Sequence, residues 1–470
     1  MPSQFIFYLL SNLSINRFLI LCFFVMSAFV VVERNWIKTL YPIQMDANGY
    51  YIYLPAIFIY NDLGKLDFVN KFPKQFDRKY FLYPSQNGGY LTKYSPGIAI
   101  LELPFFAVAH VLAPVFGSDQ SGYSPPYRLA VALSTIFYTF TGLWLLSKVL
   151  LKYFENSIVF TVVALLFFGT NLLFYTVLSA GISHNYVFCA LSFSLLFGEK
   201  WLVKRRWQDF TLACAGIGLS TLIRPTEALS GLILIGFLWS KWWKRGISIG
   251  EVLSDWKSIL GGLAGFLFTL APLFFYWKIA TGNWIAYTYE EEGFYFDRPM
   301  TIWYGLFGFR KGLFIYTPLM LSCVIGIYYL LKDKRLNHIS SAMAWYFPIN
   351  IFIVLSWYCW WYGGCFGMRA LIPTFALLAF PLAALLQHFK EKRIIYRTIL
   401  GFSVFCIGLN IFQSYQYQQQ ILHMDAMTWP AYKYIFGKAK LKPEEKAELS
   451  KLLDHPGFLE RGKKLDEYFK

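Results

Sequence analysis

The chain has 470 residues, of which 57% are hydrophobic and only 15% are charged, a balance that excludes an ordinary soluble globular class. Its formal net charge of +16 is compatible with nucleic acid or with anionic lipid as a partner. Most Lys and Arg residues lie in short loops between apolar runs, as is typical of loops that face a negatively charged leaflet. We therefore expect membrane lipids as partners and no nucleic acid.

Apolar runs of spanning length recur along the whole chain and predict about eleven transmembrane helices. The predicted spans are 15–36, 127–151, 157–178, 185–203, 210–223, 226–243, 259–280, 313–331, 341–358, 370–389 and 395–415. The predicted fold class is an all-α polytopic membrane protein with one transmembrane domain over residues 1–415. The seven cysteines lie in or beside these runs without metal-type spacing, so we interpret them as small core residues.

The charge of the loops predicts the orientation of the chain. Five alternate loops each carry two or more Lys or Arg and are predicted to be cytoplasmic: 148–152, 200–206, 241–257, 332–335 and 390–397. The remaining loops are less basic and richer in Gly, Pro and aromatic residues, which predicts that they face outward. We expect an integral protein of a bacterial inner membrane whose active site is extracytoplasmic.

The apolar segment 98–116 does not fit this alternation, because a further span here would turn every later basic loop outward. It contains Glu102 and Pro104, which suit a broken helix that lies in the interface or re-enters against protein. The first extracytoplasmic loop then covers 38–126 and is long enough to carry interfacial helices.

Residues 416–470 form a small helical tail after the last predicted span. A chain with eleven spans and a cytoplasmic start ends outside, so the tail is predicted to be extracytoplasmic, although its many Lys and Arg residues pull against that side. Within the tail, 442–453 has Pro443 followed by two glutamates, a pattern typical of a short capped helix.

Asp46 lies shortly after the first predicted span and is followed by the permissive Gly49 and the aromatic Tyr50. A carboxylate near the headgroup level is a candidate general base, and Tyr50 is a candidate contact to the substrate. The structural alternative is that Asp46 caps a helix over 47–60, a role that Asp performs well.

Four basic residues lie where the orientation rule gives no reason for a positive charge: Lys93, Arg224, Arg310 and Arg369. Lys93 precedes Pro96 near a helix start, where free N–H groups favour an anion. A glycine-rich backbone adjoins Arg369, and Arg beside such a backbone suits phosphate. We expect all four cations to bind the phosphate of a donor.

Simpler explanations remain open for these cations. Lys93, Arg310 and Arg369 could be interfacial anchors with their charges in the headgroup layer. For Arg224 the alternative is a structural ion pair with Glu227 or Asp46.

Three further outer residues are candidates for contact with the substrate. His184 opens a predicted helix, Glu292 ends an acidic run that starts at Tyr289, and Trp361 lies in an aromatic stretch whose ring faces suit sugar. A capping or structural His and a simply solvated acidic run are the structural alternatives.

No His or Cys cluster has metal-ligand spacing, no Gly-rich nucleotide loop occurs, and no Ser/His/Asp order is suggestive. One early carboxylate with several separated cations favours a reaction whose leaving group is an anionic phosphate anchored in lipid. Glycosyl transfer from a polyprenyl phosphate sugar fits, because this donor is already activated and needs no nucleotide pocket.

At these residues the chain resembles the GT-C superfamily of polyprenyl-phosphate-sugar-dependent glycosyltransferases, which includes the protein O-mannosyltransferases and the lipid A aminoarabinose transferase. The resemblance covers 15–389 and rests on the order of Asp46, Lys93 with Pro96, and the outer segments 183–185, 224–226, 292–294, 310–312 and 366–369. It implies a GT-C-like helix bundle and inverting transfer to a glycan, lipid or protein hydroxyl. Asp46 would take the place of the superfamily's catalytic acidic residue, and Lys93 would lie near the carrier phosphate.

The chain departs from that superfamily at one point. Many members have two adjacent acids at the first position, whereas this chain has Asp46 followed by Ala47. A divalent metal therefore stays open as a cofactor, and no cofactor is certain.

Two other functions share some of these features. A lipid or glycan transporter or flippase would also have intramembrane charges and broken helices, but it predicts polar residues through the bilayer centre rather than at helix ends. A polymerase or ligase of surface glycans would use the same kind of donor with an oligosaccharide in place of a single sugar.

Overall fold

The computed structural model describes residues 14–33, 42–72, 81–85, 88–245, 255–289 and 292–454, with the backbone alone over 241–245. Within these ranges the structure is mostly helical, and the sheet consists of β1 (Leu82–Pro84) paired antiparallel with β2 (Tyr90–Thr92). The expectation of an all-α fold is confirmed. The end of the first predicted span, the start of the outer loop at 38, most of the basic loop 241–257, Glu290, Glu291 and residues 455–470 lie outside the described residues.

The first half of the chain contains α2 (Ile15–Glu33), α3 (Met45–Tyr51), α4 (Tyr53–Phe58), η1 (Asp67–Lys71), α5 (Gly97–Leu112), η2 (Pro114–Phe116), α6 (Pro125–Leu150), α7 (Asn156–Phe168), η3 (Phe174–Leu178), α8 (Ser183–Lys204), α9 (Trp207–Ile223), η4 (Pro225–Ser230) and α10 (Gly231–Arg245). The second half contains α12 (Trp256–Thr281), α13 (Met300–Phe307), α14 (Leu313–Tyr316), α15 (Leu319–Lys332), η5 (Lys334–Leu336), α16 (Asn337–Leu355), η6 (Arg369–Thr374), α17 (Phe375–Phe389), α18 (Arg393–Gln418), α19 (Trp429–Ile435) and α20 (Pro443–Leu452).

Six described helical stretches are long and apolar enough to cross a membrane: Pro125–Leu150, Ser183–Lys204, Trp256–Thr281, Lys334–Leu355, Arg369–Phe389 and Arg393–Gln418. Each of the other five predicted spans also contains a helix, but these helices are shorter. Length and composition therefore support a membrane protein with six spans, while the number eleven stays a prediction.

Two predicted spans are interrupted near the site described below. In the predicted span 157–178, α7 ends at Phe168 and the chain turns before the π-helical η3. In the predicted span 313–331, the short α14 is separated from α15 at Pro318, which has no N–H to continue a helical ladder. Irregular backbone at membrane depth is tolerated where protein surrounds it.

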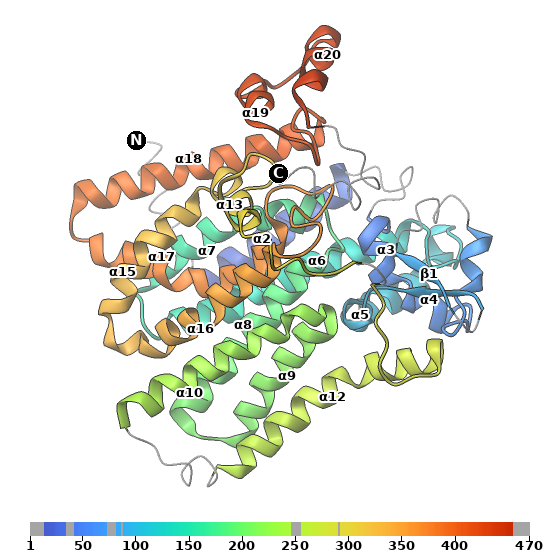
Figure 1. The fold of residues 1–470 in the computed structure, drawn as a ribbon, viewed down its shortest axis with the longest axis horizontal. Helices are drawn as coiled ribbons and strands as arrows, with labels where there is room; N and C mark the ends of the chain where they lie inside the picture. Colours follow the sequence, from blue (N-terminus) through green and yellow to red (C-terminus); the bar gives the residue numbers. More distant parts are fainter. Residues whose placement is uncertain are drawn as a thin grey trace.

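The stretch that contains η6 and α17 lies at the centre of the helix bundle. In this stretch 94% of the apolar window is buried, against 22% in α12 and 17% in α18, which lie at the periphery (Figure 1). A helix that is apolar on all sides belongs in a core. Arg369 is the first residue of this stretch, which is the most buried of the six.

The segment 98–116 forms α5 and η2 and packs against α6. Glu102 is buried there and accepts hydrogen bonds from Tyr186 at 2.7 Å and from Ser134 at 3.5 Å. Val108 and Val111 are exposed on the other face. The helix is thus bound to the bundle along one face, which is compatible with the predicted re-entrant or interfacial position.

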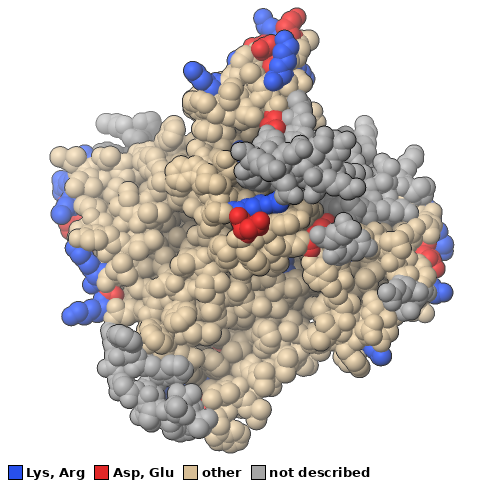
Figure 2. Space-filling model, in the orientation of Figure 1, with Lys and Arg blue, Asp and Glu red and all other residues tan. Residues whose placement is uncertain are grey.

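Charged side chains are unevenly spread over the surface. In Figure 2, Lys and Arg gather along the left-hand edge, and an area of uncharged side chains separates this edge from charges at the centre, the top and the right-hand side. The predicted cytoplasmic loops 332–335 and 390–397 follow α15 and α17, whose ends lie near that edge (Figure 1). An uncharged band between two charged sides is typical of a surface that spans a bilayer.

The described part of the tail contains two short helices, α19 and α20, which project from the end of α18 (Figure 1). The predicted helix at 442–453 is confirmed by α20. Its start is capped by the Glu445 carboxylate, which accepts a hydrogen bond from the backbone N–H of Lys442 at 2.9 Å.

Candidate functional site

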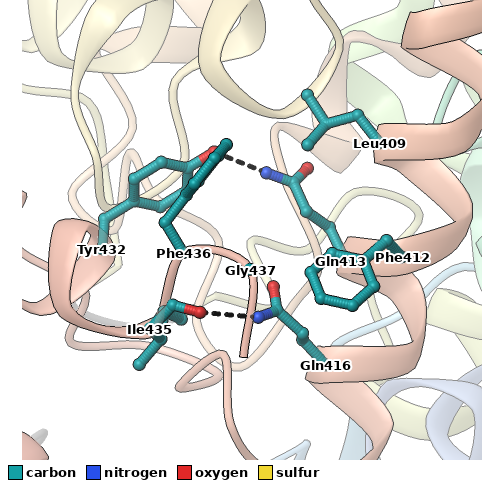
Figure 3. Close-up of a pocket in the computed structure, with 8 residues that line it drawn as sticks. All are labelled: Leu409, Phe412, Gln413, Gln416, Tyr432, Ile435, Phe436 and Gly437. Carbon is teal, nitrogen blue, oxygen red and sulfur yellow. Dashed lines mark hydrogen bonds between the residues drawn. The ribbon is translucent and has the colours of Figure 1, made fainter. Parts of the chain in front are cut away.

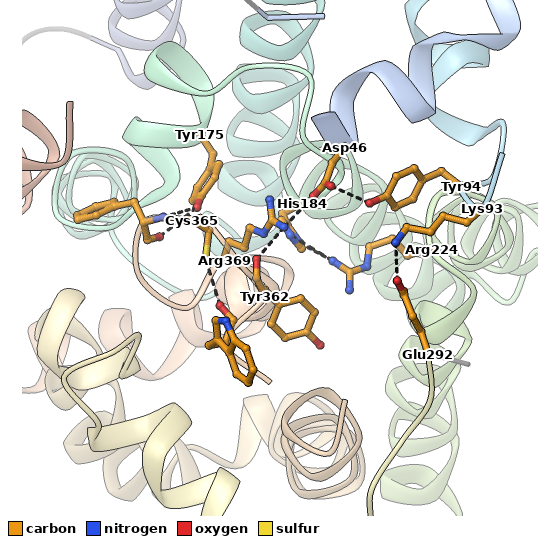
Figure 4. Close-up of polar contacts among 12 residues, drawn as sticks. Asp46, Lys93, Tyr94, Tyr175, His184, Arg224, Glu292, Tyr362, Cys365 and Arg369 are labelled. Atoms are coloured by element: carbon orange, nitrogen blue, oxygen red, sulfur yellow. Dashed lines mark hydrogen bonds and ion pairs between the residues drawn. The ribbon is translucent and has the colours of Figure 1, made fainter. Parts of the chain in front are cut away.

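Asp46 lies in the first turn of α3 and is held by two side chains from distant parts of the chain (Figure 4). Its Oδ1 accepts a hydrogen bond from the Tyr94 hydroxyl at 2.7 Å, and its Oδ2 forms an ion pair with Arg369 Nη2 at 2.7 Å. Only 17% of the Asp46 side chain is exposed. The capping alternative for Asp46 is wrong, because Gln44 occupies the N-cap position of α3 and Asp46 is already inside the helix.

A close approach between α3 and Tyr94 fixes this carboxylate. A Cβ at Gly49 would lie 2.3 Å from the Tyr94 ring, so only glycine leaves room for the ring. The ring of Tyr50 lies on the other side, with its centroid 4.4 Å from that of Tyr94. The glycine noted in the sequence is therefore needed for packing beside the carboxylate.

Arg369 is the first residue of η6 and directly follows the loop between α16 and η6. Its Nη2 also donates to the Tyr362 carbonyl at 2.9 Å. The loop bends through Gly363 at φ 65° and Gly367 at φ 59°, a region that favours glycine. The Tyr175 hydroxyl accepts from the Phe366 N–H at 2.8 Å and so ties the loop to η3. The glycine-rich stretch thus directs Arg369 toward Asp46.

Arg224 is paired with His184, a contact that the sequence did not predict. Arg224 Nη1 lies 2.9 Å from Nδ1 of His184, at the start of α8. Since a guanidinium can only donate, the ring nitrogen facing it accepts, and the imidazole is neutral in this arrangement. The sequence left open a structural ion pair of Arg224 with Glu227 or Asp46. In this structure Asp46 forms an ion pair with Arg369, and the buried Glu227 interacts electrostatically with Arg224.

Lys93 and Glu292 form an ion pair with 2.8 Å between Nζ and Oε1. The Tyr83 hydroxyl lies 3.4 Å from the same carboxylate oxygen. The pair joins the first outer loop to the loop after α12. Both residues were predicted to contact substrate groups, and in this structure they contact each other.

Tyr50 lies between the Asp46–Arg369 pair and the Arg224–His184 pair. It is buried, and its hydroxyl interacts with Ser183, directly before His184. Burial raises the pKa of Tyr50 above its ordinary value, while the nearby charge of Arg224 and the hydrogen bond with Ser183 lower it. Tyr50 therefore lies within the same site as Asp46 and Arg224.

Arg310 and Trp361 belong to a neighbouring cluster. The guanidinium of Arg310 lies 4.8 Å from the centre of the Trp361 ring, and its Nε donates to the Asp425 carbonyl at 2.9 Å. It also pairs with Asp454 at 3.2 Å. These contacts join the two residues to the C-terminal tail rather than to Asp46.

The site uses two tyrosines that were absent from the predicted set. Tyr94 bonds to Asp46, and the ring of Tyr362 lies 5.6 Å from the guanidinium carbon of Arg224. Both stand in stretches that the sequence singles out, next to Lys93 and Trp361. Their position there was the available signal, but spacing does not show which ring of an aromatic run points inward.

Among the described residues, no three His, Cys, Asp or Glu side chains are grouped closely enough to hold a metal ion. Glu290 and Glu291 lie outside the described residues. The charges that meet here are the carboxylates of Asp46 and Glu292 and the cations Lys93, Arg224 and Arg369. The buried carboxylate of Glu227 also interacts electrostatically with Arg224, so three cations and three carboxylates meet among the described residues. An anionic ligand would have to replace one of these carboxylates as the partner of a cation.

A cavity of about 110 Å³ lies elsewhere, between α18 and α19 (Figure 3). Gln413 and Gln416 line it, donating to the Tyr432 hydroxyl at 2.6 Å and to the Ile435 carbonyl at 2.9 Å. No predicted site residue lines this cavity. The charged site and this cavity are therefore separate features.

Comparison of the chain with protein-family models, with curated proteins and with solved structures finds no match.

Proposed function

We propose that the chain is an inverting glycosyltransferase that moves a sugar from a polyprenyl phosphate carrier to an acceptor hydroxyl at the extracytoplasmic membrane face. The observation that carries the proposal is the ion pair between Asp46 and Arg369, residues 323 positions apart, in a site with two further cations. A base beside several cations is what transfer with an anionic leaving group requires.

In the proposed reaction, Asp46 takes the proton of the acceptor hydroxyl as its oxygen bonds to the anomeric carbon. The bond from that carbon to the phosphate oxygen breaks, and polyprenyl phosphate leaves with the configuration inverted. General base catalysis of this kind contributes a rate factor of roughly 10²–10⁴.

Donor binding would also prepare the base. Both carboxylate oxygens of Asp46 have partners in this structure, Tyr94 and Arg369. A donor phosphate that draws Arg369 toward itself would release Oδ2 for the acceptor hydroxyl. The base would then become available only when donor is bound, which limits proton transfer in the empty site.

Arg369, Arg224 and Lys93 would stabilise the phosphate as negative charge develops on it. Fixed cations in a site that excludes water are often worth about 3–4 kcal/mol each in transition-state stabilisation. Lys93 first has to exchange Glu292 for the phosphate. The rings of Tyr50 and Tyr94 pack against each other beside Asp46 and form part of the wall of the site.

The direct test is incubation of the purified protein with a panel of polyprenyl phosphate sugars and glycan, lipid and protein acceptors. We expect release of free polyprenyl phosphate and a product whose anomeric configuration is opposite to that of the donor. Release with retained configuration would contradict the single-base mechanism. No release from any donor would contradict the proposed function.

A transporter or flippase is a second candidate, favoured by buried polar contacts that continue inward from the site. Asn185 follows His184 and donates to Thr139 at 2.8 Å and to Thr176 at 2.9 Å. Reconstituted vesicles distinguish the two functions: a flippase would move a fluorescent polyprenyl phosphate between leaflets without an acceptor, and the transferase would not.

A further inference from the structure

Lys311, between α13 and α14, is a lysine with almost no access to solvent. It is 2% exposed, and its Nζ donates to the carbonyl oxygens of Cys365 and Met424. Burial lowers the pKa of Lys311 below its ordinary value, while the nearby Asp425 raises it. Burying an ammonium group costs free energy unless hydrogen bonds compensate for the lost water. The two carbonyls provide such hydrogen bonds, and the location of Lys311 between them needs an explanation.

The two carbonyls belong to segments that are far apart in the sequence. Cys365 lies in the loop between α16 and η6, and Met424 lies in the tail after α18. The segments are joined directly as well, because the Cys365 N–H donates to the Met424 carbonyl at 3.2 Å. Lys311 therefore binds both sides of a backbone contact between the site loop and the tail, which we call the tail clasp.

Arg310 extends the tail clasp on its outer side. It donates to the Asp425 carbonyl at 2.9 Å and pairs with Asp454 at 3.2 Å. The N–H of Asp454 in turn donates to the Ala426 carbonyl at 3.0 Å. Arg310 and Lys311 thus both donate hydrogen bonds to backbone carbonyls of the tail, at Asp425 and Met424.

The tail clasp lies next to Arg369 in the sequence and in space. Cys365 is four residues before Arg369, and its thiol lies 3.4 Å from the Gly367 carbonyl. The charge of Arg369 is close enough to lower the pKa of Lys311. One end of the bent stretch 365–369 is therefore fixed by Lys311, and the other end carries the guanidinium that pairs with Asp46.

We infer that Lys311 is a positioning residue for Arg369: by joining the site loop to the tail, it holds the guanidinium where the donor phosphate binds. The inference rests on the proposed function and adds a role for the tail, which becomes part of the active site. Without the Lys311 ammonium, the Cys365 carbonyl loses this donor and the Met424 carbonyl keeps the Cys365 N–H, so the contact between the loop and the tail is weaker. Arg369 then spends less time in the orientation that binds phosphate.

The variant Lys311→Met keeps the length and apolar stem of the side chain and removes the charge. We expect an increase of about tenfold in the KM for the donor with kcat changed less than about twofold, since binding rather than chemistry is affected. Lys332→Met is the matched control, because Lys332 is exposed at the far end of α15. Asp454→Asn, which weakens the outer half of the tail clasp without a buried change, should raise the KM in the same direction by a smaller factor.

A double-mutant cycle separates positioning from a general loss of structure. If Lys311 acts through Arg369, Lys311→Met should raise the donor KM by less than about twofold once Arg369→Ala is present. Equal effects of Lys311→Met in both backgrounds would show that it does not act through Arg369 and would overturn the inference.

A second readout needs no donor. Cys365 is buried, and loosening the tail clasp should expose it to maleimide, measured at the peptide level by mass spectrometry. We expect faster labelling of Cys365 in Lys311→Met than in the unmodified protein or in Lys332→Met. Unchanged labelling would overturn the inference whether or not any donor is turned over. Absence of turnover with faster labelling would overturn the proposed function and leave the tail clasp standing.

Discussion

Lys93 and Glu292 form an ion pair within the candidate site, and a donor phosphate would have to replace it. Their 2.8 Å ion pair places a carboxylate where we propose that a donor phosphate binds. The donor phosphodiester, like the carboxylate, has one negative charge and two free oxygens, so it would bind Lys93 by exchanging for Glu292. Glu292 thus competes with the donor for Lys93, and the two residues affect donor binding in opposite directions.

We predict that Glu292→Gln lowers the KM for the donor by about two- to fivefold, since a neutral competitor is displaced more easily than an anion. Lys93→Met should raise the same KM by about tenfold or more, as expected for loss of a charge-assisted hydrogen bond. Steady-state kinetics with varied donor concentration measures both. A KM that rises in both variants would show that Glu292 helps to bind the donor instead of competing with it.

The sequence identified most of these residues but not their partners. The unusual location of Lys93, Arg224 and Arg369 in loops predicted to face outward marked them as candidates. Spacing could not show that Asp46 pairs with Arg369 and not with Arg224, because the three residues lie on separate elements. For the same reason Arg310 was grouped with the donor-binding cations, although its contacts join it to the tail.

At the scale of elements, the contact between α5 and α9 brings two parts of the site together. A Cβ at Gly97, the first residue of α5, would lie 2.7 Å from the backbone nitrogen of Ile223, the last residue of α9. Lys93 precedes this contact by four residues, and Arg224 follows it directly. The absence of a side chain at Gly97 therefore sets the separation between these two cations.

We predict that Gly97→Ala destabilises the protein by about 1–3 kcal/mol, since backbone atoms would have to move apart, and that it weakens donor binding. Gly408→Ala in α18 is the matched control, because a Cβ there meets nothing within 4 Å. Thermal unfolding in detergent and donor KM values measure the two effects. Equal stability of both variants would contradict the close contact.

Element boundaries were predictable where hydrophobicity decides them and not where tertiary contacts do. A helix occupies each predicted span, since long apolar runs have few alternatives. The break between α7 and η3 was not predicted, because the span 157–178 is apolar throughout. The Tyr175 hydroxyl bonds to the backbone of Phe366, a contact that ties η3 to the loop carrying Arg369 and that hydrophobicity alone could not show.

At the scale of the whole molecule, the tail and the candidate site occur at the same end of the helix bundle. The loop that carries Arg369 contacts Asp46 through its arginine and Met424 through its backbone. Both therefore face the same side of a membrane, which the predicted orientation makes the extracytoplasmic side. The charge rule alone left the side of the tail poorly defined, because long segments follow that rule weakly.

We predict that Lys446→Cys in the tail reacts with an impermeant maleimide from outside oriented vesicles, while Lys334→Cys reacts only after the vesicles are opened. Both lysines are exposed, whereas six of the seven natural cysteines are buried and Cys214 is partly buried. Labelling of both variants from the same side would contradict the predicted orientation of the chain.

The most direct measurement of the central claim is the rate of polyprenyl phosphate release by the unmodified protein and by Asp46→Asn, with Asp119→Asn on the exposed outer loop as the control. We predict a fall of about 10²-fold or more for Asp46→Asn at unchanged thermal stability, because the amide cannot accept the proton of the acceptor hydroxyl. Release at the unmodified rate by Asp46→Asn would contradict the assignment of Asp46 as the base.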